Sequence, residues 1–288
     1  GQQADTASEY LDWIALRECE EEVTGAFARC LFGELRADWD VMELAFVRED
    51  AAILPALHAA FEHTGVTPAI EFQTNSPFLP LPAAWEEFAA SRSGSFRNKL
   101  GKFHRDHKTA FREPGVDMTV PEAMALIREL HGRRWSGRSS SFTSADYIRF
   151  HDQIAGRFHA QGRLLLLLLQ IDGQTVAGRY DFAYGGKGWN FQGGWLPEWE
   201  RRSVGKMMIT EVIRRCIALG LREYDFLGGD AGYKSDWTEA RRVMVTVEAP
   251  NPRSLRGRLF VRLRAMVRAL RRLKSGRPLP AGPSKAAP

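Results

Sequence analysis

The sequence predicts a mixed α/β fold in which a mostly antiparallel sheet is flanked by helices. Three observations support this prediction. An apolar run at residues 163–171 is stopped by Asp172-Gly173, a dipeptide typical of the tight turn between two hairpin strands. Residues 174–184 would form the second strand, and Gly185-Gly186 marks another turn. A third strand at 187–195 would complete a three-stranded meander.

After the meander the hydrophobic period changes from that of a strand to that of a helix. Apolar residues recur at helical spacing between 204 and 219, and Gly220 supplies the stop signal. Residues 222–227 then return to strand character and end at Gly228-Gly229-Asp230. The predicted order is therefore strand, strand, strand, helix, strand.

The junction between the third strand and this helix carries the predicted chemistry. Ser203 can cap the helix, and Gly205 lets a ligand approach the backbone. Free N–H groups of a first helical turn attract an anion such as a pyrophosphate, and Arg201, Arg202 and Lys206 add positive charge. A serine-capped helix start with basic residues is also common without any ligand, so the junction alone leaves both interpretations open.

Several short motifs in this region match one enzyme superfamily. They are Gly162-Arg163 before the apolar strand, Asp172-Gly173 with Val176-Ala177, Ser203-Val204-Gly205, Gly220, Tyr224-Asp225-Phe226 and Tyr233-Lys234. With these residues, roughly 95–239 resembles the GCN5-related N-acetyltransferase (GNAT) superfamily. More narrowly, it resembles the BioF2-like branch associated with the cellulose-biosynthesis protein CelD, which is distantly similar to the Fem-type peptidyl transferases.

The resemblance implies acetyl-CoA or another acyl-CoA as co-substrate, with its pyrophosphate held at the strand-to-helix junction. The family motif there is [Gln/Arg]-x-x-Gly-x-[Gly/Ala]. Arg202-x-x-Gly205 matches it, whereas Met207 stands where the last small residue is expected. The residues expected to bind the cofactor are Gln192, Gly193, Arg201, Arg202, Ser203, Val204, Gly205 and Lys206.

Acyl transfer from a thioester needs a proton acceptor for the nucleophile, and a proton donor for the departing thiolate. Asp225 and Asp230 are candidates for the base, Tyr233 is the candidate acid, and Lys234 is expected to hold an anionic substrate or to pair with Asp225. Each has a structural alternative. Asp230 after two glycines is a common turn residue, and Asp225 at a strand end equally suits the capping of the next turn.

The resemblance also implies that the loop between the first two helices of the domain borders the acceptor site. Residues 136–141 form a polar loop, followed by a helix capped by Thr143 or Ser144. Arg134, Trp135 and Arg138 are therefore candidates for substrate contact. A Trp packed without a functional role is an equally good interpretation of that position.

The chain is expected to have three parts: an N-terminal α/β half at 1–82, a transferase domain at 83–250, and a basic helix with a disordered end at 251–288. Prolines at 77–82 predict an extended linker. The N-terminal pattern of helix, strand, helix and strand is compatible with an incomplete GNAT-like half, as in the twin arrangement of Fem-type transferases.

The formal charge of +5 hides an asymmetry. Eleven Lys and Arg and no acid follow from Arg253 onward, which leaves 29 basic and 35 acidic residues in the rest of the chain. On the helix at 253–274, leucines and Met266 recur every three or four residues while arginines occupy the other faces. Contact with an anionic membrane surface, contact with an acidic partner, and packing of the stripe on the protein all explain this pattern.

Other features argue against several classes of protein. Three cysteines far apart indicate neither a disulfide framework nor a zinc site, and His104 and His107 lack further ligands at metal spacing, so no metal is expected. No segment predicts a membrane span, and the N-terminus lacks the basic and apolar regions of a signal peptide. A cytoplasmic location, peripheral to the inner face of the membrane, is expected.

The function predicted is an acyltransferase that moves an acyl group from acyl-CoA to an amine or hydroxyl of a sugar or cell-envelope precursor. A Fem-like alternative uses aminoacyl-tRNA, supported by the basic stretch at 91–108; other nucleic acid is not expected. A third alternative is a non-catalytic partner in a polysaccharide (cellulose) synthase assembly, docked through the arginine-rich tail.

Overall fold

The computed structural model describes residues 8–62, 64–136, 141–229 and 232–275, and these form two compact units. The first unit contains residues 76–241, and the second contains 8–75 together with the chain from 242. The division therefore falls at 75 and 241, whereas the sequence suggested 82 and 250. The prediction of an extended linker at 77–82 was wrong, because strand β2 (Ala69–Pro80) continues through Pro77 to Pro80 and pairs with β7 (Glu223–Asp225) at Phe78, Leu79 and Pro80.

The first unit is built on a sheet with the order β2-β7-β6-β5-β4-β3. Its strands are β3 (Thr109–Arg112), β4 (Leu164–Ile171), β5 (Gln174–Tyr184), β6 (Lys187–Trp195), β7 (Glu223–Asp225) and the end of β2. All neighbours are antiparallel except β6 and β7, which are parallel. This confirms the predicted mixed, mostly antiparallel sheet and the meander of β4, β5 and β6.

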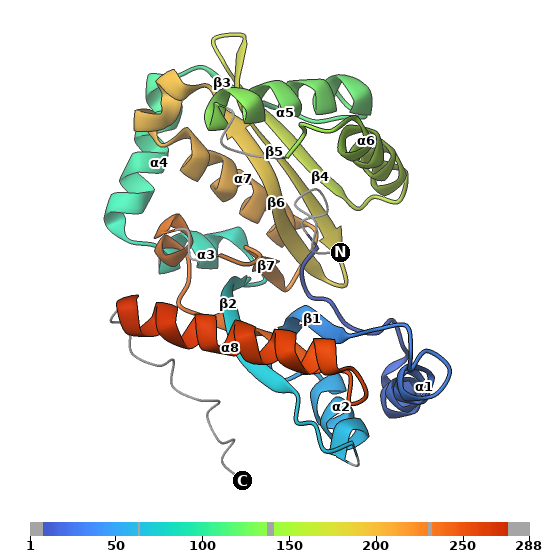
Figure 1. Ribbon diagram of the computed structural model, residues 1–288. Helices are drawn as coiled ribbons and strands as arrows, with labels where there is room; N and C mark the ends of the chain where they lie inside the picture. The colour runs from blue at the N-terminus through green and yellow to red at the C-terminus, as the bar shows by residue number, and fades with distance from the viewer. Residues whose placement is uncertain (1–7, 63, 137–140, 230–231, 276–288) are drawn as a thin grey trace. The chain divides into compact units, whose positions relative to one another are not determined.

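Helices cover both faces of this sheet (Figure 1). Successive strand residues point to opposite faces, so Gly194 and Trp195 identify which helix lies on which side. A Cβ on Gly194 would lie 2.3 Å from the backbone of Leu130 in α5 (Val120–Trp135), whereas the Trp195 ring lies against Gly205 in α7 (Val204–Ala218). Helix α5 and helix α7 therefore pack on opposite faces.

The core of the first unit follows from the sequence pattern. The leucines of β4 at 165–169 are buried, as expected for a strand covered on both faces. Helix α6 (Ala145–Ala160) begins at Ser144, whose hydroxyl accepts a hydrogen bond from the Tyr147 amide, and this confirms the predicted cap. Two more helices complete the unit, α3 (Trp85–Ser91) and α4 (Gly94–Asp106).

The second unit has its own smaller core. Strand β1 (Val41–Arg48) pairs antiparallel with β8 (Arg241–Pro250), and α2 (Ile53–Glu62) packs its apolar residues against them. A short 3₁₀ turn η1 (Arg17–Cys19) leads into α1 (Glu20–Phe32), and α8 (Leu255–Ser275) closes the unit. None of the helices in the described ranges is both long and apolar enough to span a bilayer.

Candidate functional site

A cavity opens where the sheet of the first unit is incomplete. The parallel pairing of β6 with β7 includes only Lys187, Gly188 and Trp189, although β6 continues to Trp195. Beyond the last pair lies a cavity of about 330 Å³. It is lined by residues from α5, β5, β6, the start of α7 and the segment after β7: Arg134, Gly178, Arg179, Trp195, Glu200, Ser203, Gly205, Lys206, Met208, Ile209, Tyr233 and Trp237.

The start of α7 forms one wall of this cavity. The chain leaves β6 through a 3₁₀ turn η2 (Pro197–Arg202) and enters α7 at Ser203, which has a left-handed backbone (φ 60°). The expectation that Ser203 caps the helix with its side chain was wrong, because in this conformation its hydroxyl makes no capping hydrogen bond. Among the described residues, nothing accepts a hydrogen bond from the amides of Val204 and Gly205, whereas the Lys206 and Met207 amides bond to the Ser203 carbonyl.

Arg134 reaches the cavity from the end of α5. Its Nη1 donates a hydrogen bond to the Gly193 carbonyl at 3.1 Å, on the part of β6 that β7 does not pair. Its guanidinium also stacks on two indole rings, 3.5 Å from the Trp195 centroid and 4.6 Å from that of Trp135. Burial, together with the nearby Arg179, lowers the pKa of Arg134 to about 10.

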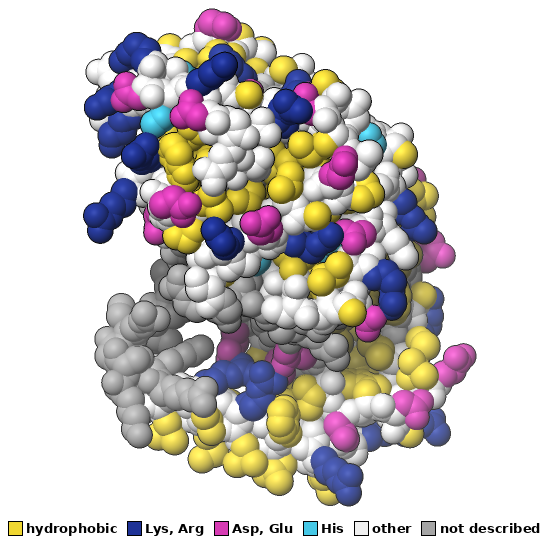
Figure 2. Space-filling view, turned by 90° about the horizontal axis from the view of Figure 1, so that it is seen from above, with side chains coloured by type: hydrophobic (Ala, Val, Ile, Leu, Met, Phe, Trp, Pro, Cys, Tyr) yellow, Lys and Arg dark blue, Asp and Glu magenta, His cyan; other side chains and the backbone are white. Residues whose placement is uncertain are grey.

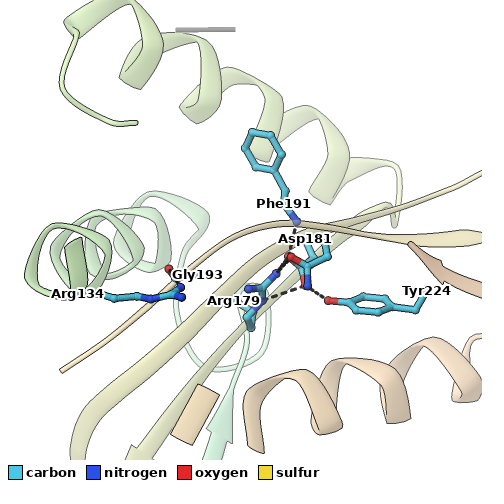
Figure 3. A network of polar contacts seen from close by, with 7 residues as sticks. Arg134, Arg179, Asp181, Phe191, Gly193 and Tyr224 are labelled. Carbon is cyan, nitrogen blue, oxygen red and sulfur yellow. Dashed lines mark hydrogen bonds and ion pairs between the residues drawn. The ribbon is translucent and has the colours of Figure 1, made fainter. Parts of the chain in front are cut away.

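Arg179 enters the cavity from the middle of β5. Its Nη2 donates to Asp181 and to Asn190, each at 2.6 Å, and Nε donates to Asp181 at 3.2 Å. Asp181 is fully buried and also accepts hydrogen bonds from the Tyr224 hydroxyl at 2.7 Å and the Phe191 amide at 2.8 Å. Figure 3 shows this network, with Arg134 and Gly193 beside it.

The network leaves part of the Arg179 guanidinium group, which lines the cavity, without a hydrogen bond to a described residue. Burial alone would lower the pKa of Arg179, but the attraction of Asp181 outweighs it and raises the pKa above the usual range. Its Nη1 makes no hydrogen bond with a described residue. Arg179 thus remains protonated beside Arg134, and a cavity wall with two guanidinium groups favours an anionic or strongly polarised ligand group.

Three further polar side chains line the same cavity. Lys206 is paired with Asp236 at 3.0 Å, Glu200 contributes a carboxylate, and Tyr233 is 37% exposed. Tyr233 follows β7 in a short 3₁₀ turn, η3 (Gly232–Asp236). Among the described residues, the cavity therefore combines cationic groups, a carboxylate, a phenol and the free Gly205 amide around the end of β6.

The structure places only some of the predicted catalytic residues at the cavity. Tyr233 lines the cavity, whereas Asp225 does not: it is fully buried, and its Oδ1 accepts a hydrogen bond from the Leu227 amide at 2.7 Å. That contact matches the alternative in which Asp225 caps the next turn. Lys234 is also buried and donates to the carbonyls of Leu227 and Gly228. Asp230 lies outside the described residues.

The predicted cofactor and substrate residues are also partly brought together. Ser203, Gly205 and Lys206 line the cavity, and the Gly193 carbonyl and Arg134 meet at its edge. The side-chain amide of Gln192 instead donates a hydrogen bond to the Ser141 hydroxyl. Neither Arg201 nor Arg202 lines the cavity, and the Arg202 guanidinium lies over the Trp199 ring. Val204 is fully buried, Trp135 contacts Arg134, and Arg138 lies outside the described residues.

Sequence reasoning missed several residues of the site. Glu200, Trp195 and Trp237 come from segments with no local motif. Arg179 had a signal, because a charged Arg-x-Asp pair inside a strand otherwise predicted to be buried needs a partner or a function. The described residues contain no group of three or more His, Cys, Asp or Glu placed to hold a metal, and His104 contacts Thr109 instead.

Comparison with solved structures gives the same fold at low sequence identity. The C-terminal domain of a putative lysylphosphatidylglycerol synthetase from Agrobacterium fabrum is 11% identical, with a TM-score of 0.56 over 82% of this chain and 74% of that one. FemX is 12% identical (TM-score 0.57, over 82% of this chain and 78% of that one), and L-PGS from Bacillus licheniformis is 12% identical (TM-score 0.52, 83% and 76%).

No curated protein sequence matches the chain. A family model for the acetyltransferase (GNAT) domain, however, matches residues 90–235, just over half of the chain. The matched residues include the cavity-lining segments of α5, β5, β6 and α7, as well as Tyr233. With its mostly antiparallel sheet, its parallel β6 and β7 and this match, the chain belongs to the acetyltransferase (GNAT) domain family.

Proposed function

We propose that this protein is an acyltransferase that moves an acyl group from acyl-CoA to an amine or hydroxyl. The acceptor would be a sugar or cell-envelope precursor at the cytoplasmic side of the membrane. The observation that carries the proposal is the cavity at the end of β6, because it joins the free Gly205 amide at a helix N-terminus to polar groups suited to acyl transfer. A thioester needs both a place for its phosphates and donors near its carbonyl.

The pyrophosphate of CoA would lie at the start of α7. The Gly205 amide, in the cavity wall, has no acceptor in the described parts of the chain, and Lys206 adds a cation on the cavity side. An anion at a helix N-terminus gains from the amide hydrogens and from the helix dipole. The thioester end of CoA would then extend along the unpaired part of β6.

The transfer would take place beside Arg134, Arg179 and Tyr233. The acceptor nitrogen or oxygen attacks the thioester carbonyl, the bond from carbon to sulfur breaks, and the sulfur leaves as a thiolate. Arg179 Nη1 would stabilise the negative charge that develops on the carbonyl oxygen, and the Tyr233 hydroxyl is the candidate proton donor to the thiolate. The proton lost by the acceptor goes to Glu200 or to water, and positioning in the cavity supplies part of the rate.

A matched pair of substitutions at Ser203 tests CoA binding. Asp and Asn tolerate the left-handed conformation of this residue and differ by one charge. We expect Ser203→Asp to weaken CoA binding by about tenfold, because a carboxylate would lie beside the phosphate site, whereas Ser203→Asn should bind nearly as well as the wild type. Isothermal titration calorimetry with CoA and acetyl-CoA measures both.

The control for this experiment is the stability of each variant, measured by thermal unfolding. A substitution at Gly205 is less suitable, because a Cβ there would lie 2.9 Å from the Trp195 ring and would disturb packing. Absence of CoA binding by the wild-type chain would overturn the proposal. Equal affinity of the two Ser203 variants for CoA would indicate that the phosphates do not bind at the start of α7.

The basic face of α4 supports a second candidate function, a transfer reaction that uses aminoacyl-tRNA as the donor. Lys99, Lys102 and Arg105 form no ion pair with a described residue, while Phe103 on the same helix is buried. Lys and Arg side chains gather at the left of the view in Figure 2, the side on which α4 lies in Figure 1. Tight binding of charged tRNA with a steep salt dependence, and no binding of CoA, would favour this candidate.

The non-catalytic role in a polysaccharide-synthase assembly makes a different prediction. If the protein only docks other components, a Tyr233→Phe variant should retain full polymer output while removal of residues 253–288 abolishes it. If it is a transferase that uses Tyr233 as the acid, the same Tyr233→Phe variant should lose activity in an assay of acyl transfer.

A further inference from the structure

Helix α8 is attached to the second unit by its arginines rather than by its leucines. Arg264 contacts Glu43 and lies 2.7 Å from Glu248, and Arg268 lies 2.8 Å from Glu248 and 2.5 Å from Glu71. Glu248 is buried in β8. The face of α8 that turns toward the protein is therefore the charged one, which is the reverse of the usual arrangement for an amphipathic surface helix.

A close backbone contact fixes this orientation at the start of the helix. Gly257 packs on Asp40 so tightly that a Cβ would lie 1.9 Å from the Asp40 carbonyl oxygen. The Asp40 carboxylate also accepts a hydrogen bond from Ser254, the residue before the helix. At 100° per residue, Gly257, Arg264 and Arg268 fall on one side of α8, so the ion pairs and this contact hold the same face inward.

The opposite face is an exposed apolar stripe. Its five main residues expose between 51% and 80% of their surfaces: Leu255, Leu259, Leu263, Met266 and Leu270. Phe260 and Val267 extend the stripe on one side and are also exposed. Hydrophobic side chains lie along the lower edge of the view in Figure 2, where α8, at the front of Figure 1, is seen after the rotation.

The charge around the stripe is of one sign. Arg256, Arg258 and Arg262 are exposed beside it, and no acidic residue occurs from Arg253 to the end of the chain. None of these three arginines forms an ion pair within the described residues. An apolar stripe flanked by unpaired cations fits a surface that presents both hydrocarbon and negative charge.

We propose that α8 binds an anionic lipid surface, lying in the plane of the membrane with its stripe among the acyl chains and its outer arginines at the phosphates. Such a helix combines apolar burial with electrostatic attraction to acidic headgroups. An acidic protein would complement the arginines but not the stripe. A second copy paired through the stripe would bring arginine against arginine.

Vesicle co-sedimentation of the full chain tests the proposal. We expect binding to vesicles of equal parts phosphatidylglycerol and phosphatidylcholine to be at least about tenfold tighter than to phosphatidylcholine alone, and to weaken with added salt. The triple variant Leu259→Ser, Leu263→Ser, Met266→Ser should lose about tenfold or more in affinity, because three buried apolar side chains are removed from the lipid. Arg256→Gln with Arg262→Gln should reduce both the affinity and its salt dependence.

The matched control replaces exposed apolar side chains by serine outside α8. Val116→Ser with Leu219→Ser removes two exposed apolar side chains of the first unit and should leave vesicle binding unchanged. All variants alter exposed positions, so thermal unfolding should stay close to that of the wild type.

Three results would overturn the proposal. The first is unchanged binding by the triple serine variant. The second is binding to soluble polyglutamate as tight as to the acidic vesicles, which would indicate an acidic protein partner. The third is a wild-type chain that is dimeric in light scattering and does not bind vesicles, together with a triple serine variant that is monomeric.

Discussion

The two units hold arginine–carboxylate clusters of similar composition in different surroundings. In the first unit the side chains of Asp181 and Arg179 are 0% and 7% exposed, and Tyr224 and the Phe191 amide complete the carboxylate's contacts. In the second unit Glu248 is buried, but its partners Arg264 and Arg268 are 39% and 24% exposed. One cluster is enclosed within the core, and the other joins a helix to the surface of a sheet.

The difference shows how solvent access changes what such a cluster does. Both charges of the enclosed pair have lost their hydration, so each depends on its partner. The arginines of the open cluster keep contact with water, and losing the carboxylate would cost less. The enclosed pair can therefore keep an arginine oriented toward the cavity, while the open cluster sets which face of α8 is presented to solvent.

Removing the enclosed carboxylate should have the largest effect. We expect Asp181→Asn to lower the free energy of unfolding by about 3 to 5 kcal/mol, because Arg179 would stay buried without a counter-charge. Urea denaturation followed by circular dichroism measures the loss. The double variant Arg179→Met, Asp181→Leu should recover much of it while losing activity, and a loss below that of Glu248→Gln would contradict the comparison.

Acid should destabilise the first unit through two buried histidines. Burial lowers the pKa of His131 and of His151 to about 4. Below the unfolded value of about 6.5 the unfolded chain binds protons that the folded chain does not, so stability is full above that pH and falls toward about pH 4.

For each histidine we expect a loss of about 2 to 3 kcal/mol across that range, measured by thermal unfolding at a series of pH values. His151→Gln should flatten the pH dependence relative to the wild type. His58→Gln, at an exposed position of the second unit, is the matched control and should not. A wild-type stability that does not change between pH 7 and pH 4 would contradict the prediction.

Breaking the open cluster should have the smallest effect. Glu248→Gln should cost about 1 to 2 kcal/mol, since the arginines it leaves are partly hydrated and Arg268 retains Glu71. The loss should shrink as salt is added, which distinguishes it from that at Asp181. Glu49→Gln, at an exposed position, serves as the control, and a salt-independent loss at Glu248 would mean that this cluster is as enclosed as the first.

Local patterns in the sequence were enough to predict most of the sheet. Asp172 and Gly173 both have positive φ, 50° and 84°, as the predicted tight hairpin requires, and the strands on either side followed from their apolar runs. The prolines near 80 were interpreted as a linker, but their extended backbone suits a strand equally well, and here Pro77 and Pro80 belong to β2.

The site was only partly predictable, because its contacts link distant parts of the chain. Arg134 was a candidate, but nothing near it in sequence indicates that it reaches the Gly193 carbonyl on another element. Ser203 matched a capping pattern, yet it adopts a left-handed backbone and its hydroxyl makes no capping hydrogen bond. The inward arginines of α8 depend on Glu43 and Glu248, which no periodicity within the helix can reveal.

The contact between Gly194 and α5 sets a limit on how this site can diverge. Two main chains meet there, so a side chain at residue 194 would require the strand and the helix to separate. A change in another side chain of the cavity lining, such as Met208 or Ile209, leaves that separation as it is. Relatives with other acceptors are accordingly expected to differ in such lining residues while retaining glycine at position 194.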